Sequence, residues 1–167
     1  MITDIRITQS WDTGIKAGAQ HDASACATFM ARGGEHYLLD MLVVKLEYPE
    51  LKRQMISHAA LFEPHAMLIE DKASGQSLLQ DLKRETSLPV IGISATADKL
   101  TRLLQVTPMM EAGRVHLPEN APWLAAFESE FFVFPDGAHD DQVDAVSQYL
   151  NWQRAQSARA EMSIRRV

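Results

Sequence analysis

The sequence predicts one α/β domain built on a mixed sheet, and three observations lead to this fold class. The first is a set of three strand-like segments at the start of the chain, separated only by turn-forming residues. The second is the alternation of helical and strand-like segments that follows them, which is typical of α/β domains. The third is size, because 167 residues fit one domain with a substantial core.

The first three strands are indicated by alternating or apolar runs between turn formers. Residues 5–11 alternate in a strand-like way and end at the turn formers 12–14. Residues 23–31 are small and apolar, and the two glycines in 32–35 predict a hairpin turn because glycine tolerates positive φ. Residues 37–46 form the third strand-like run. Three consecutive antiparallel strands are the simplest arrangement.

Helices and short strands alternate over the rest of the chain, with apolar residues at helical spacing in each helix. A three-stranded meander followed by parallel strands and crossover helices is the ribonuclease H-like order, one candidate among mixed α/β folds. The sheet is then of a five-stranded type with flanking helices. We assign residues 1–155 to this domain and 156–167 to a polar tail or frayed helix end. The expected elements are a helix at 48–62, a strand at 66–69, a helix from 74, a strand at 88–93, a helix at 97–110, an extended piece at 114–117, a helix at 123–132 and a final helix from 140.

Composition excludes several classes of function. The net charge of −6 argues against nucleic-acid binding driven by bulk charge, but not against a metal-dependent nuclease, because bound cations locally reverse the field. The single cysteine, Cys26, excludes a disulfide framework, and its small-residue strand predicts a core position. The histidines lack metal-ligand spacing. No apolar run approaches the roughly 20 residues of a membrane span, and no signal peptide is present, so we expect an intracellular, soluble protein.

Carboxylates fall at the ends of predicted strands and at the start of the last helix. Asp12 ends the first strand, and Glu70 ends the fourth. Asp140, Asp141 and Asp144 open the final helix. In open α/β sheets chemistry collects at strand ends. If the first and fourth strands are parallel neighbours, Asp12 and Glu70 lie at the same edge, and the last helix can deliver a third carboxylate.

Three carboxylates from separate elements can hold two divalent cations about 4 Å apart, an arrangement that stabilises the attacking and leaving oxygens of phosphodiester hydrolysis. Mg²⁺ and Mn²⁺ suit such oxygen ligands. Each carboxylate also has an ordinary structural alternative. The aspartates suit a helix N-terminus, Asp12 suits a turn, and Glu70 with its neighbours suits a solvated turn with a local ion pair. The phosphate loop of ATPases is absent.

Five short segments follow one another in a recognisable order. They are Trp11-Asp-Thr-Gly14, the segment 68–80 around Glu70-Asp-Lys72, Ala97-Asp-Lys-Leu-Thr-Arg102, the segment 110–118 and His139-Asp-Asp-Gln-Val-Asp-Ala145. Each segment alone is a weak signal, but together they cover most of the chain, and in this order they resemble the C-terminal nuclease domain of the large subunit of tailed-phage terminases, the DNA-packaging motors.

The resemblance implies a ribonuclease H-like fold and an endonuclease that uses two Mg²⁺ or Mn²⁺ ions to cut concatemeric double-stranded DNA. It maps the acidic cluster onto Asp12, Glu70 and the Asp140-Asp141 pair. We take Asp12, Glu70 and Asp141 as catalytic and metal-binding, with Asp140 as a supporting ligand and Asp144 in reserve. Positions 141 and 144 share a helix face, whereas 140 points about 100° away from 141.

Three basic residues are candidates for contacts with DNA. Lys72 lies beside Glu70 and could touch a phosphate or tune a metal-bound water. Lys99 and Arg102, three apart on one helix face, could contact the DNA backbone. The alternative for both is a solvated helix face.

The resemblance also implies partners and a compartment. A full large subunit begins with an ATPase motor domain, which this chain does not contain, so we expect no ATP as a cofactor here. The expected partners are that ATPase domain, the small subunit and the portal, in the host cytoplasm during packaging, with no membrane or virion role. Two alternatives remain open. One is another ribonuclease H-like nuclease, a resolvase or hybrid ribonuclease, and the other is a non-catalytic docking module of the motor.

Overall fold

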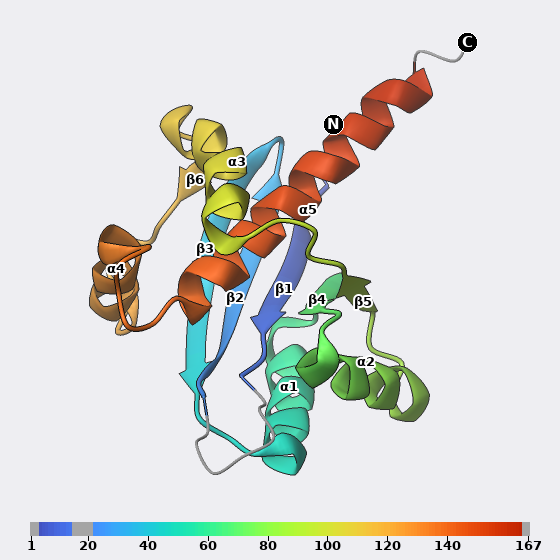
Figure 1. Cartoon of the computed structure of the whole chain (residues 1–167). Coiled ribbons are helices and arrows are strands. Elements are labelled where there is room, and N and C mark those ends of the chain that lie inside the picture. The colour runs from blue at the N-terminus through green and yellow to red at the C-terminus, as the bar shows by residue number, and fades with distance from the viewer. Residues whose placement is uncertain (1–3, 15–21, 165–167) are drawn as a thin grey trace.

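Strand β1 (Arg6–Asp12) lies in the middle of the sheet and joins its antiparallel half to its parallel half (Figure 1). The computed structural model describes residues 4–14 and 22–164. Its six-stranded sheet has the order β5-β4-β1-β2-β3-β6. The other elements are β2 (Ser24–Arg32), β3 (Glu35–Val44), α1 (Tyr48–Phe62), β4 (Ala66–Glu70), α2 (Ala73–Glu85), β5 (Val90–Ile93), α3 (Lys99–Glu111), β6 (Val115–His116), α4 (Leu124–Val133) and α5 (Asp141–Ile164).

The mixed topology expected from the sequence is confirmed. β1, β2 and β3 form an antiparallel meander, and β4 and β5 run parallel to β1 on its other side. The expectation of a five-stranded sheet is corrected by β6, which pairs in parallel with β3 through His36 and Tyr37. A strand of two residues is too short to show a period in the sequence. Gly113, with φ of 71°, ends α3 and returns the chain to the sheet.

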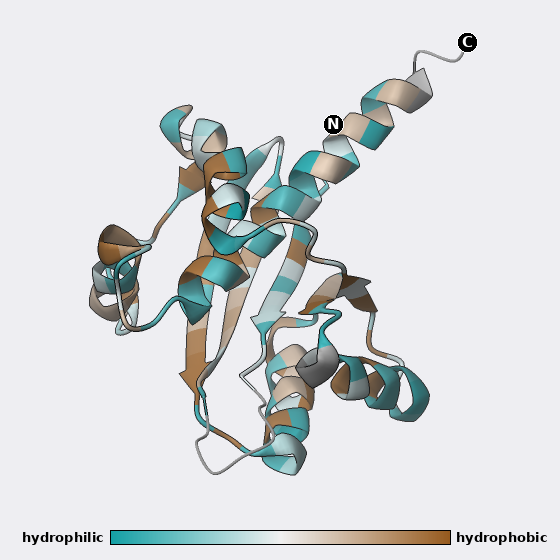
Figure 2. Ribbon diagram, viewed as in Figure 1, coloured by the Kyte–Doolittle hydropathy of each residue, from teal (hydrophilic) through white to brown (hydrophobic). Residues whose placement is uncertain are grey.

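The sheet is covered on both faces, and the alternation of side chains along β1 and β2 supplies both cores. Trp11 and Cys26 point toward α1 and α2, where they are fully buried, which confirms the core position expected for Cys26. On the other face Phe29 stacks on Tyr149 of α5, with ring centroids 4.1 Å apart. Figure 2 shows the hydrophobic residues of β3 and β5 and the hydrophilic outer turns of α2.

Helix α5 crosses the sheet and is held to β1 by polar as well as apolar contacts. Residues 142–150 are all buried. Nε2 of Gln148 donates to Oγ of Ser10 at 2.9 Å and to the carbonyl oxygen of Trp11 at 3.2 Å. This pairing satisfies buried polar groups at the centre of the sheet and places the start of α5 over the end of β1.

Beyond the sheet α5 continues as an exposed helix that projects from the body (Figure 1). The helix runs to Ile164, so the region assigned to a polar tail or frayed helix end is helical as far as the structure describes it. Residues 165–167 lie outside the described residues. The division at residue 155 therefore stays a prediction. Within 4–14 and 22–164, no helix has both the length and the apolar character required to span a bilayer.

Candidate active site

The parallel pairing of β1 and β4 brings Asp12 and Glu70 to one edge of the sheet. The register pairs Trp11 with Ile69, so the residue after each lies at the same carboxyl end. Asp12 is the last residue of β1, and Glu70 is the last residue of β4. This is the geometry expected from the sequence if the two strands were neighbours.

A pocket of about 360 Å³ opens at this edge, and the predicted carboxylates line it. Asp12 and Glu70 come from the sheet, and Asp140 and Asp141 come from the start of α5. Carboxylates from three elements far apart in the sequence therefore share one cavity. A group of this composition has the chemistry of a hard-cation site.

Asp22 and Lys45 also line the pocket, and sequence reasoning did not select them. The expected antiparallel strands could have indicated both residues. Because β2 is antiparallel to β1, with Asp12 paired to Ala25, the residues before β2 lie beside the end of β1. Lys45 directly follows β3, whose last residue Val44 pairs with Ser24.

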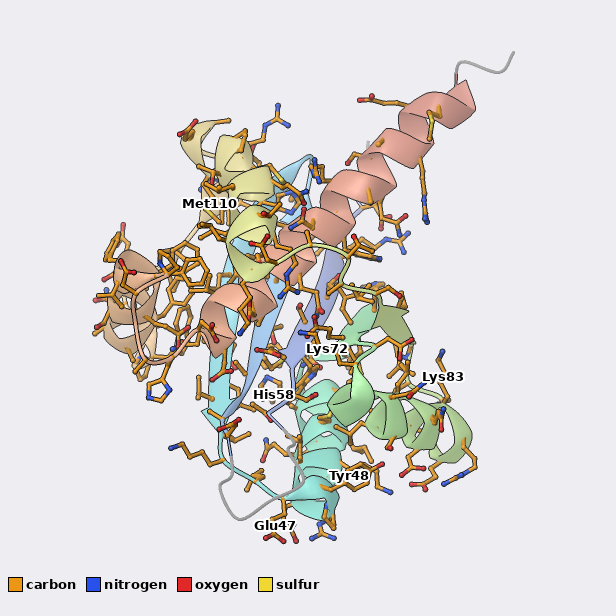
Figure 3. All side chains as sticks on the ribbon, in the orientation of Figure 1. Glu47, Tyr48, His58, Lys72, Lys83 and Met110 are labelled. Atoms are coloured by element: carbon orange, nitrogen blue, oxygen red, sulfur yellow. The ribbon has the colours of Figure 1, made fainter. Side chains whose placement is uncertain are left out.

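Three basic side chains bind the carboxylates of this cluster. Nζ of Lys99 lies 2.7 Å from Oδ1 of Asp140 and 2.6 Å from Oδ2 of Asp144. Arg102 places Nη1 3.1 Å from Oε1 of Glu70 and Nη2 3.5 Å from Oδ1 of Asp144. Lys72 binds the same Oε1 of Glu70 at 2.8 Å, and Figure 3 shows Lys72 at the edge of the sheet where β1 ends.

These contacts show that the two basic residues on α3 bind carboxylates of the cluster. Asp98 caps the helix by accepting from the backbone N–H of Thr101, which places Lys99 in the first turn. Arg102 is only 9% exposed, so the alternative of a solvated helix face is wrong for this residue. Both side chains point into the acidic cluster. Their contact with DNA, like that of Lys72, stays a prediction.

The two ends of the acidic run at the start of α5, Asp140 and Asp144, share Lys99 as a partner. The sequence argument grouped Asp141 with Asp144 and turned Asp140 away, but Asp140 and Asp144 converge on Lys99. Asp144 is 4% exposed and does not line the pocket, whereas Asp141 does. The choice of Asp141 as the main ligand from α5 stays a prediction.

The basic neighbours do not fully offset the cost of burying these carboxylates or the repulsion among them. Burial, followed by the charges of Asp144 and Asp141, raises the pKa of Asp12 to about 8, against a lowering effect of Lys99. Burial and then Asp140 and Glu130 raise the pKa of Asp141 above its usual range. Burial also raises the pKa of Asp144, although its bond to Lys99 opposes the shift. The charged forms of these groups are disfavoured unless further positive charge is present.

Lys99 responds in the opposite sense. Burial alone lowers the pKa of its ammonium group, but the hydrogen bonds to Asp140 and Asp144 outweigh burial and raise the pKa well above its usual range. Lys99 therefore stays protonated and acts as a fixed positive charge between α3 and α5.

Glu130 of α4 caps the helix that carries Asp141. Its Oε2 accepts from the backbone N–H of Gln142 at 2.8 Å and from that of Val143 at 3.1 Å. The first N–H groups of a helix have no partner within the helix, and a carboxylate there also suits the positive end of the helix dipole. Sequence reasoning missed Glu130, because a cap supplied by another helix leaves no local pattern.

Gly75 allows α2 to begin directly against the end of β4. A Cβ at this position would lie 2.3 Å from the carbonyl oxygen of Glu70 and 3.4 Å from Oγ1 of Thr13. Only glycine avoids that overlap without movement of the backbone. The position of Glu70 at the end of β4 therefore depends on the absence of a side chain at residue 75.

The donor set fits a divalent cation, although its oxygens are engaged by basic side chains. Among the residues at 4–14 and 22–164, no group of three or more Asp, Glu, His or Cys side chains has the arrangement of a metal site as it stands. Lys72, Lys99 and Arg102 bind oxygens of the cluster. Burial and the neighbouring carboxylates nevertheless raise the pKa of Asp12, so an added cation would favour its charged form. Asp12, Glu70 and Asp141 are the residues that line the pocket and could hold a cation.

Comparisons with known proteins agree with this fold. Residues 9–152 match the family described as the terminase RNase H-like domain. No curated protein matched the chain. The solved structures similar to it include the large terminase of a thermophilic bacteriophage, with a TM-score of 0.64 and 13% identity over 87% of this chain and 39% of that one.

Two isolated domains are similar over most of their own length. The large terminase nuclease of the thermophilic phage G20c, with bound zinc, has a TM-score of 0.64 and 14% identity over 87% of this chain and 80% of that one. The human cytomegalovirus terminase nuclease domain has a TM-score of 0.59 and 10% identity over 89% and 82%. At these identities the likeness shows the fold. The chain spans about two fifths of the bacteriophage large terminase that it matches.

Proposed function

Because the chain belongs to the family of terminase RNase H-like domains, we propose that its acidic pocket is the active site of a metal-dependent DNA endonuclease. The observation that carries the proposal is the convergence of Asp12, Glu70 and Asp141 on one pocket at the carboxyl edge of the sheet. Three separate elements supply these side chains. Hydrolysis of a phosphodiester bond is the reaction that such a cluster suits.

We propose that Asp12, Glu70 and Asp141 hold two Mg²⁺ or Mn²⁺ ions, with Asp140 as a supporting ligand. When bound, the ions supply the positive charge that stabilises the transition state of phosphodiester hydrolysis. The raised pKa of Asp12, caused by burial and by neighbouring carboxylates, supports this assignment because a bound cation would favour its ionised form. The similar G20c nuclease domain has been solved with bound zinc and, in another crystal structure, with bound magnesium.

The surrounding residues of this chain keep the ligands in position. Lys72 and Arg102 both bind Oε1 of Glu70, which limits the rotation of this carboxylate. Lys99 fixes Asp140, and Glu130 fixes the helix turn that carries Asp141. A rigid arrangement of carboxylates limits the reorganisation that metal binding and catalysis require.

We also infer the substrate and the partners from membership of this family. The substrate is concatemeric double-stranded DNA, and the partners are the ATPase domain, small subunit and portal of a packaging motor in the host cytoplasm. ATP belongs to the motor domain in this scheme and is not a cofactor of this chain. The similarity to a bacteriophage large terminase supports the motor context.

A metal-dependent cleavage assay tests the proposal. The wild-type domain should nick or linearise plasmid DNA with Mn²⁺ or Mg²⁺ and stop with EDTA. Asp12→Asn and Glu70→Gln should lower cleavage by at least about 100-fold, since each removes a charged ligand. Asp136→Asn, at an exposed carboxylate before α5, is the matched control and should cleave normally. Wild-type rates in folded Asp12→Asn and Glu70→Gln proteins contradict the assignment.

The substrate class is tested separately. Duplex plasmid, a four-way junction and an RNA–DNA hybrid should be compared at equal concentration under the same metal conditions. A packaging endonuclease should prefer the duplex plasmid. Preferential cleavage of the junction or the hybrid identifies a resolvase or a hybrid ribonuclease instead.

A non-catalytic docking module is the second candidate, and the ion pairs of the cluster favour it. Lys99 and Arg102 already bind Asp144 and Glu70, so the acidic residues have structural partners. Calorimetric titration with Mn²⁺ separates the two functions. Binding that is lost in Asp12→Asn supports the nuclease, whereas the absence of binding with and without DNA supports the docking module.

A further inference from the structure

A second groove, of about 350 Å³, lies beside the acidic pocket at the same edge of the sheet. Its floor is the segment 92–97 at the end of β5, and its walls come from α3 and α5. The register pairs Ile93 with Glu70, so the groove begins next to the acidic strand end. Arg102 lines the groove and also binds Glu70, which makes this guanidinium the boundary between the two cavities.

The charge of this groove is the reverse of that of the pocket. Arg102, Arg154 and Arg159 line it, and no Asp or Glu does within the described residues. The charge of the groove is therefore opposite in sign to the net charge of −6 of the chain. Around the arginines are hydroxyl and amide side chains and one indole ring, namely those of Ser94, Thr96, Gln105, Gln148, Asn151 and Trp152.

The guanidinium of Arg154 is held in place by hydrogen bonds to uncharged groups. Its Nη2 donates to Oε1 of Gln105 at 3.3 Å and to Oδ1 of Asn151 at 3.2 Å, and both acceptors are uncharged. In the part of the chain that the structure describes, neither Arg154 nor Arg159 forms an ion pair with a carboxylate. The Arg154 guanidinium is thus oriented by two amides, and its charge is available to an anion.

We propose that this arginine groove binds the sugar-phosphate backbone of DNA next to the segment that enters the acidic pocket. The inference rests on the proposed nuclease function and adds a binding surface to it. Guanidinium groups pair with phosphate oxygens through two parallel hydrogen bonds. Hydroxyl and amide side chains are the other common donors to phosphate and sugar, and the indole of Trp152 offers a face for stacking or apolar contact.

The groove would also supply the affinity for DNA that the acidic pocket lacks. A cluster of carboxylates repels phosphate until cations bind, so the pocket by itself contributes little affinity for DNA. A basic groove at the neighbouring strand end supplies attraction that does not depend on metal. Helix α5, which forms one wall of the groove, continues beyond the sheet as an exposed helix (Figure 1).

Fluorescence anisotropy with a labelled DNA duplex in EDTA tests the groove without catalysis. The double variant Arg154→Ala/Arg159→Ala should bind at least about tenfold more weakly than wild type, and the slope of log affinity against log salt should fall by about two, one for each lost phosphate contact. The control Lys83→Ala/Arg84→Ala removes two charges from exposed positions on α2 and should lose less than about threefold. Thermal unfolding verifies that both variants fold.

Three outcomes decide between the possibilities. A loss confined to the groove variant, with the reduced salt slope, supports the proposal. Equal losses in both double variants show bulk electrostatics and overturn it. Unchanged DNA affinity in the groove variant also overturns it and leaves an acidic protein surface as the ligand of the groove.

The failure of this inference is distinguishable from failure of the nuclease assignment. Asp12→Asn should abolish cleavage but keep the wild-type salt slope for DNA binding in EDTA. If wild-type protein never cleaves, but the groove variant still loses affinity, the groove stands and the nuclease proposal falls. If cleavage depends on Asp12 while the groove variant binds normally, the reverse holds.

Discussion

The ammonium nitrogen of Lys99 lies 2.6 Å from Oδ2 of Asp144, so a side chain of α3 fixes the first turns of α5. The same nitrogen binds Asp140, one helical turn earlier. A permanent cation from the protein thus stands inside the acidic cluster. The consequences for stability and metal binding can be measured.

Lys99→Met should destabilise the metal-free domain and make it more responsive to metal. The variant leaves Asp144 buried with less positive charge, at an expected loss of about 1–2 kcal/mol after allowance for the exposure of Lys99. Saturating Mg²⁺ should then raise the melting temperature more than it does in wild type. Thermal unfolding with and without Mg²⁺ measures both effects. Lys83→Met, at an exposed position on α2, serves as the control and should change neither.

The stability of the metal-free domain should fall as pH rises from about 4 to about 8. The pKa of Asp12 is raised to about 8 by burial and by Asp144 and Asp141, so the folded state retains a proton that the unfolded chain releases near pH 4. Stability declines wherever the folded state binds more protons than the unfolded chain, and for Asp12 this holds over the whole interval between the two pKa values. Urea unfolding in EDTA at pH 5 and pH 8 tests the direction.

Asp12→Asn and metal provide the controls for that pH effect. The amide does not titrate, so the decline between pH 5 and pH 8 should be reduced in this variant. Saturating Mg²⁺ should also reduce it in wild type, because a cation favours the ionised carboxylates. A wild-type decline that Asp12→Asn leaves unchanged assigns the titration to other groups.

Glu130→Gln should weaken the start of α5 and lower cleavage more than it lowers folding. The amide keeps the shape of the side chain but loses the charge-assisted bonds to the N–H groups of Gln142 and Val143, at a cost of about 1 kcal/mol. Asp141 then loses a fixed position, so plasmid cleavage should fall by about tenfold or more. Melting temperature and cleavage rate are the two readouts. Glu128→Gln on the same helix should leave both unchanged.

Gly75→Ala should destabilise the domain by about 2 kcal/mol or more, because the new Cβ would overlap the carbonyl oxygen of Glu70. Either α2 or the end of β4 has to move, and Glu70 moves with the strand. Urea unfolding and the affinity for Mn²⁺ should both be affected. Ser77→Ala, at an exposed position of the same helix, is the control. Normal stability in Gly75→Ala contradicts the tight approach.

The sequence predicted the parts of the site that depend on strand ends. Asp12 and Glu70 end buried strands, and the ribonuclease H-like order, one candidate from the sequence, makes those strands parallel neighbours. Both positions are therefore accessible to reasoning about topology. The extended conformation around β6 was predicted at 114–117, but its pairing with β3 was not, because a strand of two residues is too short to carry a period.

The contacts between helices could not be predicted from the sequence. Lys99 and Arg102 reach Asp144 and Glu70 only because α3 packs against α5 in one particular orientation. Glu130 caps α5 from α4, across the loop that joins the two helices. Such pairs depend on tertiary docking, and helical spacing within one element cannot predict them.

The order of the acidic residues along the chain has a consequence for the synthesis of the protein. Asp12 belongs to the first strand, whereas Asp141 begins the last helix. As the chain leaves the ribosome from its N-terminus, the sheet can begin to form before α5 has emerged. The acidic pocket is incomplete until that helix docks on β1. A nascent chain that has not yet reached α5 therefore lacks the third carboxylate, and the complete site arises only after this helix has been synthesised.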